Sequence, residues 1–228
     1  MKKYLQILQA CPLFHNKDRQ EITSIIEQSK HKICAYKKNE YICQCWQSFP
    51  YLGIVLEGSL EVHNNLESGK IVHVLYKNKG NVLGGAMVFS KDYDGQFDVI
   101  AKETCKLLLI EKKSVFNVLL KDSVIASNIL DLFSREIINL NKKIVLFSYS
   151  LIREKIAYFL LQNIESNAAS VIHLPYSKKA LSEHLHVSRS TLSRELKKLS
   201  TQGILEINHK TIVILNKQKL EAILNNNE

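Results

Sequence analysis

The 228-residue sequence predicts an α+β fold: antiparallel β-structure first, then a long helix, then a small helical domain with a β-hairpin. Three observations support this order. Seven of the eight glycines lie between residues 53 and 95, where short apolar runs alternate with turns. Residues 114–163 contain neither Gly nor Pro and carry apolar residues at helical spacing. Residues 176–228 combine two short helical patterns with two β-runs.

The net charge of +9 comes from 31 Lys and Arg residues against 22 Asp and Glu residues. Such an excess favours a polyanionic partner, such as nucleic acid or an acidic membrane surface. No run reaches the ~18 apolar residues of a membrane span, and Gln6 and Gln9 interrupt the N-terminal apolar run, unlike a signal peptide. Five cysteines without framework spacing are typical of reduced thiols. We therefore expect a cytoplasmic protein with no membrane partner.

The first 110 residues predict two short helices and then a set of strands. Residues 4–30 have helical spacing, and Pro12 separates two helices. The alternating run 53–63, an ESGK turn and the apolar run 71–76 predict a hairpin. Residues 98–113 predict two more strands. We expect these strands to close into a small antiparallel barrel or roll.

The long helix carries a heptad pattern. Between residues 126 and 151 its apolar residues recur at alternating intervals of four and three, with polar flanks such as Arg135 and Lys142. A narrow seam of this period is typical of two helices in a coiled coil, although a long helix packed on its own domain is the alternative. We favour a parallel homodimer, with an interface at Leu130, Phe133, Ile137, Leu140, Ile144 and Phe147.

After a bend near residues 148–150 and a second helix, the C-terminal segment predicts a helix-turn-helix with a wing. Ser177 and Ser188 are suited to cap two short helices, which a three-residue turn separates. Two β-runs, 204–207 and 211–215, flank an Asn-His pair and predict a tight hairpin.

The second helix of this motif exposes residues that suit DNA. Arginine can bond the O6 and N7 edge of guanine bidentately, and serine can bond phosphate or base. A solvated helix could carry the same residues, but the caps, the turn, the inward leucines and the hairpin together favour double-stranded DNA. Two copies in a dimer would read an inverted-repeat operator. The candidate DNA contacts are Ser177, Lys178, Lys179, Ser188, Arg189, Ser190, Thr191, Ser193, Arg194, Lys197 and Lys210.

The segment resembles the winged helix of the Crp/Fnr transcription regulators. The family's recognition helix begins Ser-Arg-x-Thr and carries a second Arg, as residues 188–191 and Arg194 do here, and the wing end KTIVIL at 210–215 is also similar. This chain departs from the family at His186, where the turn often has Gly, and at Ser190, where many members have Glu. Histidine tolerates positive φ better than most residues, so we expect the turn to form.

The resemblance extends to the N-terminal half. The stretches CPLF at 11–14, GIVLEGSLEV at 53–62 and KGNVLGG at 79–85 resemble the family's cyclic-nucleotide-binding-type β-roll, which is of the double-stranded β-helix type. The resemblance implies a sensor domain at 1–118, a dimerisation helix at 119–148 and a DNA-binding domain at 149–228. It also implies RNA polymerase as a further partner. No nucleophile–base set, phosphate loop or paired carboxylates point to an enzyme instead.

The resemblance also implies where an effector would bind. Cyclic-nucleotide-binding members have a Gly-Glu-Leu stretch and a downstream Arg for the phosphate, but the matching stretch here lacks the Glu. No Arg occurs between residues 20 and 134. We expect that cyclic AMP is not the ligand, that no cofactor is bound, and that the site takes another small molecule or none. The candidate pocket residues are Gly84, Gly85, Ala86, Met87, Gln96, Leu140 and Asn141.

The cysteines leave an alternative open. Cys43 and Cys45 would share one face of a strand, and with Cys34 and Cys105 they could hold a metal or form a redox switch. Buried structural thiols are the simpler explanation, because cysteine is a common small core residue. We expect no metal site, and keep a redox- or metal-sensing regulator on the same scaffold as the alternative.

Overall fold

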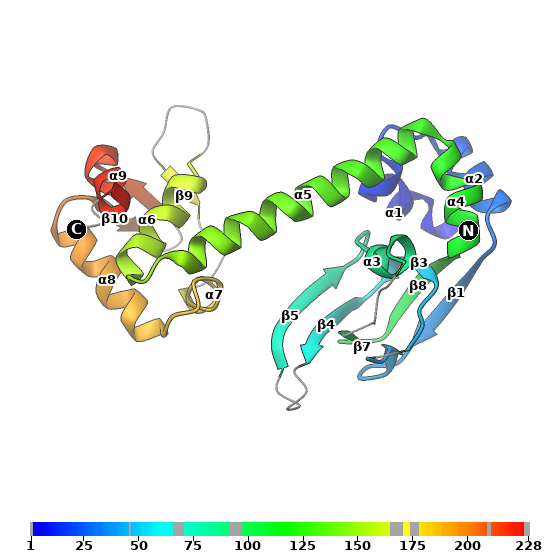
Figure 1. The fold of residues 1–228 in the computed structure, drawn as a ribbon, viewed down its shortest axis with the longest axis horizontal. Coiled ribbons are helices and arrows are strands. Elements are labelled where there is room, and N and C mark those ends of the chain that lie inside the picture. Colours follow the sequence, from blue (N-terminus) through cyan, green and yellow to red (C-terminus); the bar gives the residue numbers. More distant parts are fainter. Residues whose placement is uncertain are drawn as a thin grey trace. The chain divides into compact units, whose positions relative to one another are not determined.

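A computed structural model shows two compact units, Met1–Arg135 and Glu136–Glu228, and the division falls within the long helix α5 (Ser123–Ser148) (Figure 1). The first unit is a β-roll with helices, and the second is a helical domain with a small sheet. The α+β prediction is therefore confirmed. The structure describes residues 2–45, 47–65, 71–91, 97–164, 171–173, 178–208 and 211–225.

Short helical segments begin the first unit, and Pro12 separates them as predicted. Asp18 caps the last segment, because its carboxylate accepts the N–H groups of Gln20 and Glu21, both at 2.8 Å. The Glu21 carboxylate accepts the Asp18 N–H in return, which completes a capping box. The segments are η1 (Lys2–Tyr4), α1 (Leu5–Ala10), η2 (Pro12–Phe14) and α2 (Arg19–Gln28).

The described strands of this unit form two antiparallel sheets, with the orders β1-β8-β3-β6 and β2-β7-β4-β5. The predicted hairpin is β4 with β5, and its turn lies outside the described residues. The strands are β1 (His31–Tyr36), β2 (Tyr41–Cys43), β3 (Tyr51–Glu57), β4 (Ser59–Asn65), β5 (Ile71–Asn78), β6 (Val82–Leu83), β7 (Phe97–Ala101) and β8 (Cys105–Glu111).

The prediction of a single alternating strand over 53–63 is wrong. Gly58 has a φ of 75° and separates β3 from β4, which belong to different sheets. A Cβ at Gly58 would lie 2.5 Å from the Thr104 carbonyl oxygen, so the sharp turn requires glycine. Residues 52–56 are all buried because β3 is a central strand with both faces covered, so its run does not alternate.

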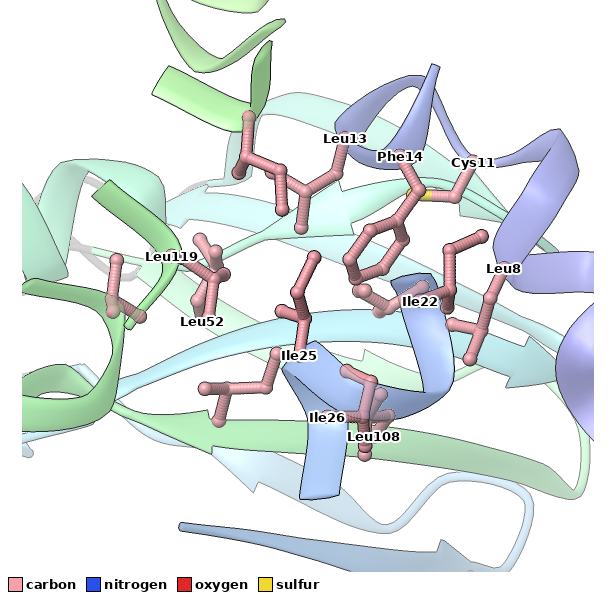
Figure 2. Packing of buried hydrophobic residues seen from close by; sticks show 14 of the residues in the cluster. Leu8, Cys11, Leu13, Phe14, Ile22, Ile25, Ile26, Leu52, Leu108 and Leu119 are labelled. Atoms are coloured by element: carbon pink, nitrogen blue, oxygen red, sulfur yellow. The ribbon is translucent and has the colours of Figure 1, made fainter. Parts of the chain in front are cut away.

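The two faces of the first sheet pack against different partners. Leu52 and Leu108 meet the N-terminal helices, including Leu8, Phe14 and Ile22 (Figure 2). Residues on the opposite face, such as Leu107, pack with the second sheet. This layered core also buries Ile125 and Ile129, which anchor the start of α5 on the roll.

Helices α3 (Gly85–Phe89) and α4 (Lys112–Asn117) and the turn η3 (Leu119–Lys121) lead to α5. Asp122 caps α5 by accepting the N–H groups of residues 124 and 125, and it also binds Lys17 Nζ at 2.7 Å. The Asn128 side-chain amide donates to the carbonyls of Leu13 and His15, at 3.1 and 2.8 Å. Polar contacts therefore fasten the first two turns of α5 to the N-terminal segment.

In the second unit, the helices share one hydrophobic core with the sheet β10-β11-β9, and α6 contacts both α8 and α9. The predicted bend near residues 148–150 is confirmed, because α5 ends at Ser148. Among the helices of the described residues, none has the length and apolar character that a membrane crossing requires. The elements are α6 (Ile152–Gln162), β9 (Val171–His173), α7 (Lys178–His184), α8 (Arg189–Thr201), β10 (Leu205–Asn208), β11 (Thr211–Ile214) and α9 (Lys217–Asn225).

Candidate nucleic-acid interface and sensor site

The turn between α7 and α8 has the geometry of a helix-turn-helix. His186 adopts a left-handed conformation with a φ of 53°, as predicted for a residue that replaces glycine. The Val187 N–H donates to the Ser182 carbonyl at 3.0 Å, which closes the turn. The His186 ring packs edge-to-face on Phe147 of α5, with ring centroids 4.9 Å apart. The end of α5 thus contacts the turn that positions α8.

Ser188 caps α8, as predicted. Its Oγ accepts the Thr191 N–H at 3.1 Å and lies 2.9 Å from the Ser190 hydroxyl and 2.6 Å from the Thr191 hydroxyl. Leu192 of the same helix is buried. Ser188 and Thr191 therefore fix the start of the helix. Leu192 marks the face of α8 that packs in the core.

Removal of the cap should loosen α8. We expect Ser188→Ala to lower the local free energy of opening of α8 by about 1 kcal/mol, because an N–H of the first turn loses its acceptor. Hydrogen exchange at the α8 amides would measure this. Ser188→Asn keeps a capping oxygen and should exchange like the wild type. Equal protection in the Ala variant would show that the cap does not stabilise the helix.

The outer face of α8 carries positive charge. Arg189, Arg194 and Lys197 are exposed, and none makes an ion pair with any described residue. Lys198, in contrast, binds Glu195 at 3.3 Å. Since residues 189, 193 and 197 are four positions apart, they lie along one side of the helix. This face therefore offers guanidinium and ammonium groups that no carboxylate of the described chain neutralises.

The structure describes only some of the other candidate DNA contacts. Lys178 begins α7, and Lys179 is exposed and lies 3.9 Å from Glu183. Ser190 and Ser193 are exposed on α8. Ser177 and Lys210 lie outside the described residues.

The proposed interface residues are exposed in the single chain, with one exception. Phe133 is half-buried against its own roll. The last residue of the heptad run, Leu151, lies three positions beyond α5, where it directly precedes α6. The other proposed interface residues have large exposed fractions: Leu130 67%, Ile137 58%, Leu140 53%, Ile144 65% and Phe147 48%.

Part of the candidate effector site comes together on α3. Gly84 has a φ of 81°, and a Cβ there would lie 2.3 Å from the Tyr51 carbonyl oxygen, so this turn requires glycine. Gly85, Ala86 and Met87 form the first turn of the helix and bring no charged side chain. Gln96 lies outside the described residues, and Leu140 and Asn141 are exposed on α5 in the second unit.

The prediction that Cys43 and Cys45 share a strand face is wrong. Strand β2 ends at Cys43, and Cys45 lies in the following turn, where its N–H donates to the Asp98 carboxylate at 2.8 Å. Burial raises the pKa of Cys11 to about 11, and it raises the pKa values of Cys43 and Cys105 as well. A thiol with a raised pKa is a poor nucleophile and metal ligand. Within the described ranges, no group of three His, Cys, Asp or Glu side chains could hold a metal ion.

Oxidation should therefore leave DNA binding unchanged. We expect the wild type, Cys43→Ser and Cys45→Ser to bind the same duplex equally, before and after mild peroxide treatment and with or without a chelator. Fluorescence anisotropy would measure the affinities. A large loss in the oxidised wild type that either substitution abolishes would favour a redox switch.

Models of two protein families match the chain. The model described as a Crp-like helix-turn-helix domain matches residues 154–223, and the one described as a cyclic nucleotide-binding domain matches residues 33–122. The chain belongs to the Crp/Fnr family. This Crp/Fnr protein is a DNA-binding transcription regulator with an effector domain, and not an enzyme.

Several solved structures resemble this Crp/Fnr regulator. The catabolite activator protein of Thermus thermophilus is 19% identical, with a TM-score of 0.55 over 93% of this chain and 98% of that one. A CooA variant from Carboxydothermus hydrogenoformans is 16% identical, with a TM-score of 0.60 over 92% of each chain. CprK (C200S) in complex with OCPA is 16% identical, with a TM-score of 0.66 over 89% and 92%. These likenesses show the fold alone. No curated protein sequence matches the chain significantly.

Proposed function

We propose that this regulator is a parallel homodimer that binds an inverted-repeat operator through one α8 helix from each protomer. The observation that carries the proposal is the exposed face of α8, where Arg189, Arg194 and Lys197 have no partner among the described residues. Residues 1–118 would form the sensor, 119–148 the dimerisation helix and 149–228 the DNA-binding domain. Such a regulator would work in the cytoplasm. Its partners there would be double-stranded DNA and RNA polymerase.

The residues of the interface divide by role. Arg189 lies in the first turn of α8, where side chains of a recognition helix reach base edges, and Arg194 follows about 140° around the helix. Ser190 and Ser193 flank them and supply hydroxyl groups for bases or phosphates. We assign phosphate contacts to Lys197 and to the residues around the start of α7 and the wing, namely Ser177, Lys178, Lys179 and Lys210.

The stoichiometry of the complex tests this proposal. Sedimentation of the protein with a duplex that holds a complete inverted repeat should give two chains per duplex. A duplex with one half-site removed should bind much more weakly, because the second helix then meets only non-specific DNA. One chain per duplex, with equal affinity for the half-site, would contradict the dimeric mode of binding.

We also propose that cyclic AMP does not regulate this protein. The first turn of α3 lacks a glutamate for a ribose hydroxyl, and the sensor unit has no arginine between residues 20 and 134 for the phosphate. Calorimetry with millimolar cyclic AMP should show no saturable heat. A micromolar dissociation constant would contradict the proposal and would mean that other groups replace the missing pair.

A further inference from the structure

Phe133 of α5 lies directly against the start of α3. A Cβ built on Gly85 would come within 3.1 Å of the Phe133 Cζ atom and 3.3 Å of its Cε1 atom. The ring also meets Phe89, the last residue of α3, edge-to-face, with centroids 5.4 Å apart and planes at 86°. Phe89 in turn contacts Phe116 of α4 at 5.7 Å. Gly85 thus lets an aromatic ring approach the backbone of the first turn of α3.

The packing of α5 explains why this ring faces its own roll. Ile125, Ile129 and Phe133 are four positions apart, so they form one stripe on the helix. Both isoleucines are buried in the core that the roll shares with the N-terminal helices, and Phe133 packs against that core. The cap at Asp122 and the amide contacts of Asn128 fix the start of the same stripe. The ring position is therefore set by contacts within the sensor unit.

Phe133 differs from its neighbours in the heptad seam. Leu130 and Ile137 are more than half exposed, whereas Phe133 is half-buried. The segment 84–89, whose Gly85 and Phe89 it contacts, is Gly-Gly-Ala-Met-Val-Phe and has no charged side chain. An anion placed there would have to displace an apolar ring and would meet no cationic side chain from α3. The chemistry of the site therefore favours the aromatic ring over a phosphate.

We propose that the Phe133 ring occupies the candidate effector site at the first turn of α3. This side chain, and not a small molecule, then holds α5 against α3. The protein would then bind its operator without a small-molecule effector at α3. This inference rests on the proposed function, because it assigns the regulation of the same dimeric DNA-binding protein. A helix held at α3 keeps a fixed direction, which two recognition helices need if they are to meet successive major grooves.

Substitutions that expel the ring test the proposal. Gly85→Ala forces the ring to move by a few tenths of an ångström, and Gly85→Leu fills its place. We expect operator affinity to fall about threefold for Gly85→Ala and by about tenfold or more for Gly85→Leu, within the usual range of coupling between sites. The control is Ala10→Leu, since Ala10 is exposed at the end of α1 in the same unit, outside the candidate effector site, and should tolerate the larger side chain within about twofold.

A combined variant shows whether the ring itself is responsible. Phe133→Leu shortens the side chain and makes room for a methyl group at Gly85. The double variant Gly85→Ala, Phe133→Leu should therefore lose less affinity than the product of the two single losses. A loss equal to that product would overturn the proposal. Circular dichroism identifies any variant that fails to fold, and if Gly85→Leu does so, the milder Gly85→Ala decides.

Removal of bound small molecules is the second test. Wild-type protein is unfolded in guanidinium chloride, desalted in denaturant and refolded, and the dimer fraction is counted by sedimentation. We expect that the refolded dimer binds the operator within about twofold of untreated protein. Loss of binding that a small-molecule extract of the native protein restores would overturn the inference, as would unchanged or increased affinity of Gly85→Leu. If untreated wild type fails to bind the selected duplex at all, the proposed function itself fails.

Discussion

A Leu140→Glu variant should sediment as a monomer and lose specific operator binding. Leu140 is exposed in the single chain and lies midway along the proposed seam, between Ile137 and Ile144. In the dimer its carboxylate would be buried without a partner in each protomer, at a cost of several kcal/mol. Sedimentation velocity over a range of protein concentrations would measure the shift from dimer to monomer, and anisotropy would measure operator affinity.

The control for this variant is Asn139→Glu. Asn139 is exposed one position earlier on α5, outside the heptad seam, and the substitution adds the same charge. It should remain dimeric and bind the operator nearly as the wild type does. A Leu140→Glu protein that stays dimeric would contradict the assignment of the heptad seam as the dimer interface. Equal dissociation of both variants would show that added charge alone, and not seam packing, controls assembly.

An Arg189→Ala variant should lose about 1–3 kcal/mol of binding free energy per half-site on the selected operator and should relax the base preference at one position. The side chain stands in the first turn of α8, exposed and without an ion-pair partner in the described part of the chain. Competition binding against operators with single base changes would locate the relaxed position.

Lys179→Ala provides the contrast. Its exposed ammonium group lies near the start of α7 and pairs only loosely with Glu183. We expect the substitution to weaken binding to the operator and to a scrambled duplex equally. It should also lower the slope of log affinity against log salt concentration by roughly one unit for each lost contact. If Arg189→Ala also weakens both duplexes equally, Arg189 is a phosphate contact, and the bases are read by Arg194, Ser190 or Ser193.

The features that the sequence predicted well depend on local chemistry. A serine before a helix accepts an N–H of its first turn wherever the helix lies, and Ser188 does so. Histidine can adopt a positive φ, and His186 does so in the turn. The heptad run likewise predicted a long helix, and α5 has 26 residues. Each of these follows from neighbours within a few positions of the chain.

The errors come from tertiary contacts. The run 53–63 looks like one strand because its apolar and polar residues alternate, but Gly58 turns the chain against the Thr104 carbonyl. Cys45 leaves the strand because the Asp98 carboxylate, 53 positions away, accepts its N–H. Phe133 stays in the predicted seam by its spacing, and its contacts with Gly85 and Phe89 are a further feature that the local pattern did not predict. No local pattern predicts these contacts, because the partner residues come together only in the folded roll.

Selection of duplexes from a random library by the wild-type protein tests the central claim most directly. After several rounds at physiological salt, the bound fragments are sequenced. The account predicts an inverted repeat whose half-sites lie one helical turn apart, about 34 Å between centres, with a guanine at a position that Arg189→Ala no longer selects. Recovery of fragments with no shared sequence, or of a single unrepeated half-site, would contradict a dimer that reads DNA with two α8 helices.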